Sequence, residues 1–299
     1  MVRRIILLSV IGLLGWNVAF SCDACGCSIT GSGVGMLVSY RNNFAGLSWF
    51  STPYQASPDH GFGSKDRFQT LEFAFRFHIA SRLKLLINQP YRINARTLDG
   101  ETEQVSGISD TRIMGAYTLF RDVRLGARNK LFLEVGAGIK APLGRYDAHI
   151  HDQELPENFN LGNGSWAGLL QANLVVTRQN SGLLAAGTYQ YNTATAAGYR
   201  FGRQVSGQLI GFREIALGRM VSLIPNAGLT AEWVSDDHYA NGNIVPGTSG
   251  SGLFASGGVN LKFNNFYIGA SFAQPLAQDY SHGEVIAKSR VSCQVSYLF

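Results

Sequence analysis

The sequence predicts an all-β protein: an antiparallel transmembrane β-barrel of about 12 strands, preceded by a cleaved signal peptide. Three observations carry this prediction. A secretory signal occupies the first residues, apolar and polar residues alternate along most of the remaining chain, and the connections between alternating segments are short and long in turn. Strands of ~10 or more residues in such an order are typical of barrels that cross a membrane.

The signal spans residues 1–21. Arg3 and Arg4 give it a positive start, and its apolar stretch (residues 5–14) is too short and too near the start to be a membrane helix. Small residues at Ala19 and Ser21 fit signal peptidase, so the mature chain is expected to begin at Cys22. The alternative is lipoprotein processing with Cys22 lipidated, a pattern that the bulky residue before Ser21 fits poorly. No later apolar run reaches the roughly 18–20 residues of a spanning helix.

Composition agrees with an exported barrel. Charged residues make up 15% of the chain, below the roughly 25% of soluble domains, and the chain holds 35 glycines. The net charge of +5 would raise nucleic acid as a partner. Export and the even spread of the basic residues along the chain argue against that partner.

The last ten residues, 290–299, show the strand pattern most clearly. Val291, Cys293, Val295 and Tyr297 share one face with Phe299, and polar residues alternate with them. Tyr297 and Phe299 are interpreted as an assembly signal for the barrel-assembly machinery, and the strand is expected to pair with residues 44–51 and close the barrel.

Eleven earlier segments alternate in the same way. Residues 67–79 are the clearest example, because Leu71, Phe73 and Phe75 face one side while Glu72 and Arg76 face the other. Pro90 in the next segment predicts a bulge or a strand mouth. The predicted strands are 44–51, 67–79, 83–94, 107–119, 130–141, 166–177, 183–193, 199–215, 220–235, 253–263, 266–273 and 290–299.

Tight turns follow every second strand, and longer loops, such as the polar segment 97–106 and the longest loop 142–163, follow the others. This rhythm places both chain ends on the periplasmic side. A soluble β-sandwich or β-helix also alternates, but it rarely keeps such a rhythm through twelve strands. The predicted organisation is a signal peptide (1–21), a periplasmic cysteine-containing segment (22–43) and an outer-membrane barrel (44–299).

Short motifs add a resemblance. The start of the mature chain, Cys22-Asp23-Ala24-Cys25-Gly26-Cys27, the segment Asn43–Leu47, the strand opening Gly107-Ile108-Ser109-Asp110 and the terminal Phe299 resemble a family of outer-membrane transporters. The family is that of the barrels named after the meta-pathway of phenol degradation, and its Bacteroidetes-type members share the cysteine-rich start. The resemblance implies a barrel with a transport role in the outer membrane of a Gram-negative bacterium, without a substrate.

If the apolar residues of each strand face lipid, the residues that alternate with them line the lumen. Charged residues are costly at membrane depth unless they face water or one another. The residues expected to line the lumen are Glu72, Arg76, His78, Lys84, Arg92, Arg112, Glu134, Lys140, Glu232, Lys262 and Arg290.

Two interpretations of this lumen remain open. Its basic bias favours a narrow channel for small polar or anionic solutes. A twelve-stranded barrel is also narrow enough for its interior to be filled by Glu–Arg pairs that only satisfy one another. The first interpretation gives a channel or transporter with membrane lipids and a small-molecule solute as partners.

The cysteine cluster supports a different hypothesis. Cys22, Cys25 and Cys27 could hold a soft metal ion such as copper or zinc, which would make the protein a non-conducting metal binder. A tetrahedral zinc site would need a fourth ligand, and the alternatives are a disulfide with one free thiol or a lipid on Cys22. His149 and His151 in the longest loop are a second metal candidate, although loop histidines are usually only solvated.

No enzyme activity is predicted. Residues 235–238, Ser-Asp-Asp-His, lie together near a barrel rim, but neighbours in sequence do not make a catalytic triad. No phosphate-binding loop or dinucleotide motif is present.

Overall fold

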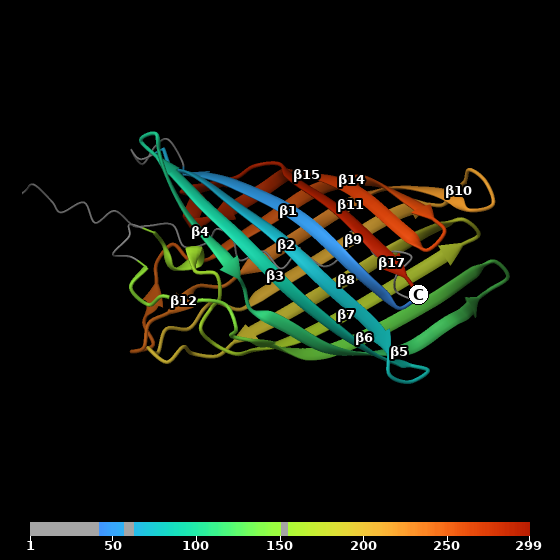
Figure 1. Ribbon diagram of the computed structural model, residues 1–299, viewed down its shortest axis with the longest axis horizontal. Helices are drawn as coiled ribbons and strands as arrows, with labels where there is room; N and C mark the ends of the chain where they lie inside the picture. The colour runs from blue at the N-terminus through green and yellow to red at the C-terminus, as the bar shows by residue number, and fades with distance from the viewer. Residues whose placement is uncertain (1–41, 57–62, 151–154) are drawn as a thin grey trace, which may run out of the picture.

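A computed structural model of the chain describes residues 42–56, 63–150 and 155–299. Twelve antiparallel strands form a closed barrel whose axis runs along the longest dimension in Figure 1. In barrel order these are β1 (Phe44–Ala56), β2 (Lys65–His78), β3 (Leu83–Leu98), β5 (Thr111–Leu125), β6 (Asn129–Ala141), β7 (Ala167–Arg178), β8 (Ser181–Asn192), β9 (Gln204–Arg213), β11 (Val221–Val234), β14 (Gly250–Phe263), β15 (Phe266–Tyr280) and β17 (Arg290–Leu298). No helix in the described part of the chain is long and apolar enough to cross a membrane.

The closing seam lies where the sequence predicts it. Strand β17 pairs with β1 from Phe44–Leu298 to Ser51–Val291, and its other edge pairs with β15. At the barrel end that carries the tight turns, Leu298 donates its backbone N–H to Asn265 and Phe299 donates to Asn43. Closure gives each of the twelve barrel strands a neighbour on both sides, so that no open barrel edge faces lipid, which could not satisfy it.

The two faces of the wall differ in chemistry. Outward side chains on β2 are Leu71, Phe73, Phe75 and Phe77, each 38–42% exposed. Inward neighbours on the same strand, such as Glu72 and Arg76, are almost fully buried. An apolar outer face and a polar inner face follow directly from the alternation in sequence, because successive side chains of a strand point to opposite sides.

The predicted polar loop 97–106 is wrong. Strand β3 extends to Leu98, and β4 (Glu101–Ile108) returns along its outer half from Leu98–Glu101 to Tyr91–Ile108. Asp99 and Gly100 both have positive φ, the conformation that an Asp-Gly hairpin turn requires. This hairpin is polar on both faces, so it lacks the apolar alternation by which the membrane-level strands are recognised.

The motif at residues 107–110 also differs from expectation. Ser109 and Asp110 separate β4 from β5 rather than opening a strand. Pro90 lies opposite this gap: β3 pairs with β5 as far as Asn88 and with β4 from Tyr91. Proline has no backbone N–H to donate, and Pro90 is accommodated because it lies where the neighbouring strand is interrupted. The pairing of β2 with β3 continues through Pro90 without a bulge.

Pro53 repeats this arrangement at the seam. Strand β1 pairs with β17 as far as Ser51 and with the short β16 (Val285–Ala287) from Tyr54. The predicted strand 199–215 begins only at Gln204, because residues 199–203 belong to the outer loops. Strand β15 runs to Tyr280 instead of ending at residue 273, and a register shift opposite Leu253–Phe254 accommodates Pro275.

Candidate functional site: a cavity inside the barrel

The residues expected to line the lumen lie on the inward parity of their strands. Seven of them are buried and four are partly buried. The buried ones are Glu72, Arg76, Lys84, Glu134, Lys140, Glu232 and Arg290, and the partly buried ones are His78, Arg92, Arg112 and Lys262. His78 lies at the end with the tight turns, where its ring Nδ1 is 2.6 Å from Oδ1 of Asn43.

Carboxylates on this inner face take part in ion pairs that span several strands. Glu134 on β6 lies 2.5 Å from Nη2 of Arg76 on β2 and 2.7 Å from Nζ of Lys84 on β3. Glu72 pairs with Arg112 and also accepts a hydrogen bond from Asn88. These contacts join neighbours and non-neighbours around the wall, so part of the interior charge is neutralised inside the protein.

A second cross-link lies near the outer end. Arg290 on β17 donates to both carboxylate oxygens of Glu232 on β11, at 2.6 and 2.8 Å, although β14 and β15 lie between these strands. Its guanidinium also stacks 3.9 Å from the centroid of the Phe254 ring and donates to the hydroxyl of Tyr54. This bidentate pair holds the closing strand to β11, three strands further round the wall.

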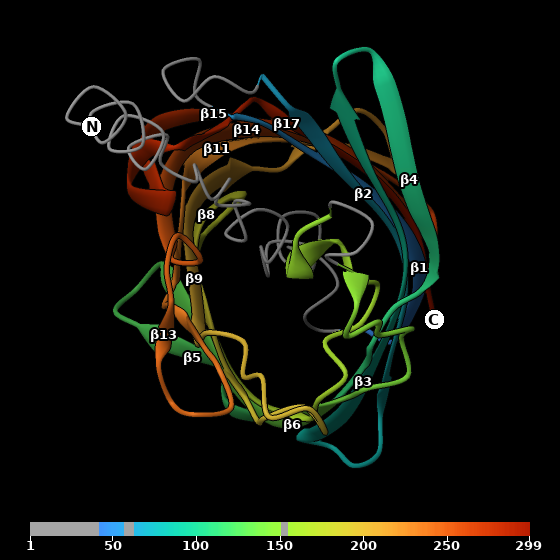
Figure 2. The ribbon, with the colours of Figure 1, turned by 90° about the vertical axis from the view of Figure 1, so that its left-hand side faces the viewer.

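The longest loop, between β6 and β7, folds into the barrel opening instead of standing outside it (Figure 2). Ile150, Leu155 and Phe159 of this loop are buried in one cluster with Tyr54 and Phe68 of the wall. The loop includes the short helix η4 (Glu157–Phe159). It therefore narrows the outer mouth.

Phe159 fixes the loop to the wall from three sides. Its ring lies 4.9 Å from that of Phe68, the Arg96 guanidinium lies 5.0 Å from its centroid, and its carbonyl accepts a hydrogen bond from Asn94 at 3.0 Å. The sequence prediction missed this function of the loop. Its signal is the presence of large apolar residues in an otherwise polar outer loop.

Three outer loops meet beside this constriction. Asp237, in the short strand β12 (Asp237–His238), accepts hydrogen bonds from the hydroxyl of Tyr199 and the backbone N–H of Gly202 at 2.6 and 2.5 Å. Burial raises the pKa of the Asp237 carboxyl to about 7. Burial, with the nearby charge of Asp237 adding to it, also raises the pKa of Glu157 on the inserted loop to about 7.

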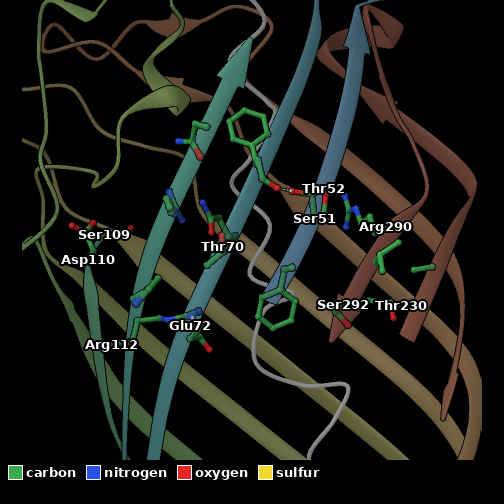
Figure 3. Close-up of a pocket in the computed structure, with 18 of the residues that line it drawn as sticks. Ser51, Thr52, Thr70, Glu72, Ser109, Asp110, Arg112, Thr230, Arg290 and Ser292 are labelled. Atoms are coloured by element: carbon green, nitrogen blue, oxygen red, sulfur yellow. Dashed lines mark hydrogen bonds and ion pairs between the residues drawn. The ribbon is translucent and has the colours of Figure 1, made fainter. Parts of the chain in front are cut away.

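A cavity that opens to solvent lies below the constriction. Figure 3 shows Glu72, Asp110 and Arg112 on one side of this space and Thr230, Ser292 and Arg290 on the other. Among the described residues that line it, the cations are Arg92, Arg112, Lys140 and Arg290, and the carboxylates are Glu72 and Asp110. Among these described residues the cations outnumber the carboxylates, although Arg290 is also paired with Glu232, which lies outside the lining.

The metal candidates are not brought together by the described structure. Cys22, Cys25, Cys27 and His151 lie outside the described residues, so the predicted copper or zinc site stays a prediction. Within the described ranges no group of three or more His, Cys, Asp or Glu residues could hold a metal ion. Cys293 is a free cysteine on the exposed outward face.

The serine, aspartate and histidine near residue 235 have structural partners. Ser235 Oγ accepts the backbone N–H of Arg203, Asp237 is held by Tyr199 and Gly202, and His238 forms a backbone bridge with Arg200. These residues hold two outer loops together.

The closed barrel, its apolar outer face and its polar interior define the class: a transmembrane β-barrel of the type found in the outer membrane of Gram-negative bacteria. No protein-family model matches the chain, and no curated protein matches it either.

Among solved structures, the chain is similar to an outer membrane channel from Pseudomonas putida F1, with 14% identity, a TM-score of 0.63, and coverage of 86% of this chain and 96% of that one. The β domain of the Bordetella autotransporter BrkA (17% identity, TM-score 0.47, 86% and 100% covered) and the monoaromatic hydrocarbon channel CymD (10%, 0.39, 87% and 89%) are looser matches. At 14% identity the likeness to the Pseudomonas putida F1 channel shows a shared barrel fold.

Proposed function

We propose that the protein is an outer-membrane channel that passes small polar solutes and favours anions. The observation that carries the proposal is the cavity inside a closed, lipid-facing barrel, whose described lining holds four cations against two carboxylates. A positive lining lowers the barrier for anions and raises it for cations. The similarity in fold to a channel from Pseudomonas putida F1 supports a transport role.

Two of the paired cations also reach the cavity. Arg112 is paired with Glu72 and Lys140 lies 3.1 Å from Asp110, yet both cations also line the cavity. Their positive groups are therefore presented to a solute from fixed positions. Fixed charges along a narrow path are the usual source of charge selectivity in membrane pores.

The test is a reversal-potential measurement on refolded protein in a planar lipid bilayer under a KCl gradient. We expect chloride to be favoured over potassium, and Arg112→Gln to reduce this preference about two-fold or more, because it removes one fixed charge from the path. Arg82→Gln, in an exposed turn, is the matched control and is expected to keep the wild-type ratio. A correctly folded barrel that conducts no ions would contradict the proposal.

A further inference from the structure

The cavity has two chemically different walls. On the side formed by β2, β3, β5 and β6, Glu72, Arg92, Arg112 and Lys140 bring charge to the lining. On the side formed by β8, β9, β11, β14 and β15, which are consecutive in the barrel, the described lining residues are all neutral, and Arg290 of the adjoining β17, which is paired with Glu232, borders this side. Each of these five strands contributes a hydroxyl or an amide: Gln190, Gln204, Thr230, Ser256 and Ser271.

Part of the neutral wall carries polar groups that can form further hydrogen bonds. The hydroxyl of Ser256 is buried and has no hydrogen-bond partner among the residues that the structure describes, and Ser256 as a whole is 9% exposed. Gln204 is 5% exposed and lines the same space. A buried hydroxyl without a partner loses its hydrogen bonds with water, which a bound molecule with its own hydroxyls would restore.

The two walls face each other across one space. A solute whose carboxylate lies against Arg112 and Lys140 would direct the rest of its atoms toward the amides and hydroxyls of the neutral wall. These protein groups both donate and accept hydrogen bonds. Hydroxyl groups on the solute have the same double capacity. A plain hydrocarbon chain would instead leave the buried polar groups of the neutral wall unsatisfied, and such discrimination against a missing hydroxyl is strong when the site is built from polar groups.

We propose that this cavity selects small carboxylates that carry several hydroxyl groups, the class of the sugar acids. The proposal rests on the channel function above and adds the identity of the solute. The cationic wall recognises the carboxylate and the neutral wall recognises the hydroxyls. A neutral sugar would lack the first interaction, and an unsubstituted fatty carboxylate would lack the second.

Three probes of six carbons separate these contributions: gluconate, hexanoate and glucose. In planar bilayers at pH 8, gluconate is expected to reduce the chloride current at lower concentration than hexanoate, and glucose to leave the current almost unchanged. Permeability from reversal potentials is expected to favour gluconate over hexanoate. Equal effects of gluconate and hexanoate on a conducting channel would overturn this inference, whereas a folded barrel without any chloride current would overturn the channel proposal itself.

Variants of the neutral wall test the assignment directly. Thr230→Val and Ser256→Ala keep the side-chain size nearly constant and remove one hydroxyl each. Each is expected to weaken the gluconate effect about three- to ten-fold, the value of a single hydrogen bond, and to leave the hexanoate effect and the chloride conductance unchanged.

Ser296→Ala is the matched control, because Ser296 is also buried on the inner face but lies at the other end, on β17, outside the described cavity lining. It is expected to keep the wild-type response to gluconate. A loss of the gluconate effect in Ser296→Ala equal to that in Ser256→Ala would overturn the inference as well, because the cavity wall would then have no special role.

Discussion

The Arg76 guanidinium and the Glu134 carboxylate meet 2.5 Å apart inside the barrel, although two strands, β3 and β5, lie between their own strands. Lys84 adds a second cation to the same carboxylate at 2.7 Å, and all three side chains are at most 1% exposed. One buried carboxylate therefore compensates two buried cations, and it ties three strands of the wall together.

Glu134→Gln is expected to destabilise the barrel strongly. The substitution removes the negative charge that pairs with both Arg76 and Lys84, and removing one partner of a buried pair typically costs about 3–5 kcal/mol. Unfolding by urea in lipid vesicles, followed by heat-modifiable migration on gels, measures the effect. Glu103→Gln, on the exposed surface of β4, is the control. An unchanged midpoint for Glu134→Gln would show that the pair contributes no net stability.

Phe159→Ala is expected to enlarge the conducting path. The truncation removes the contacts with Phe68 and Arg96 that hold the inserted loop against the wall, and loss of a buried phenylalanine typically costs about 3–5 kcal/mol. The single-channel conductance in KCl should rise. Leu143→Ala removes a side chain of the same loop that is 66% exposed, and should leave the conductance at its wild-type value. Equal conductance in all three proteins would argue against the loop as the constriction.

The outer loops are expected to loosen as pH rises through neutrality. The pKa values of Glu157 and Asp237 are raised to about 7 by burial. Nearby carboxylates raise each pKa further: Asp237 and then Asp147 for Glu157, and Asp236 for Asp237. Their phenolic neighbours are Tyr146 and Tyr199. The packed loops bind the protons of these two carboxyl groups more tightly than opened loops do. The resulting stabilisation of the packed loops is therefore fully present below about pH 4 and is lost progressively up to about pH 7.

Limited proteolysis and single-channel recordings between pH 5 and pH 8 measure this change. The equilibrium constant for loop opening should rise with pH by up to about ten-fold per pH unit for each titrating acid. Asp237→Asn keeps the acceptor for Gly202 but cannot ionise, so its pH response should be smaller. Asp279→Asn, exposed at the end of β15, should behave like the wild type. Proteolysis that is independent of pH in the wild type would contradict the expectation.

The barrel could be predicted from the sequence because lipid imposes a strict pattern on membrane-level strands. Leu71, Phe73 and Val295 are exposed to lipid on one parity, and that parity is visible without a structure. Strand β4 was not predicted because it lies beyond the membrane, where neither face of a strand needs to be apolar. The start of β9 was misplaced because Tyr199 and Phe201 are buried among loops, and so they look like strand residues in sequence.

For the cavity, only the set of inward-facing positions could be predicted from the sequence. Alternation identifies which side chains face inward, but the partner of Glu134 depends on strand tilt and stagger, which sequence spacing does not give. The inserted loop was missed for a related reason. The contacts of Phe159 are with Phe68 and Asn94, which are distant in sequence.

Deletion of Phe299 is expected to reduce membrane insertion more than it changes any pore property. Its ring stacks on Tyr297, with centroids 6.4 Å apart, and the Tyr297 ring in turn contacts Phe266 of β15. Tyr297 and Phe299 at the end of the closing strand and Phe266 at the start of β15 are all exposed on the outward face, so the loss of Phe299 leaves the cavity lining intact.

The fraction of heat-modifiable protein in outer-membrane preparations measures insertion, and chloride selectivity of the inserted fraction measures the pore. Phe263→Ala is the matched control, because it removes an equally exposed aromatic ring from the same end of the barrel but from a strand other than the closing one. We expect insertion to fall several-fold only when Phe299 is removed. If Phe263→Ala reduces insertion equally, the effect belongs to the aromatic girdle as a whole, and Tyr297 and Phe299 lose their assignment as an assembly signal.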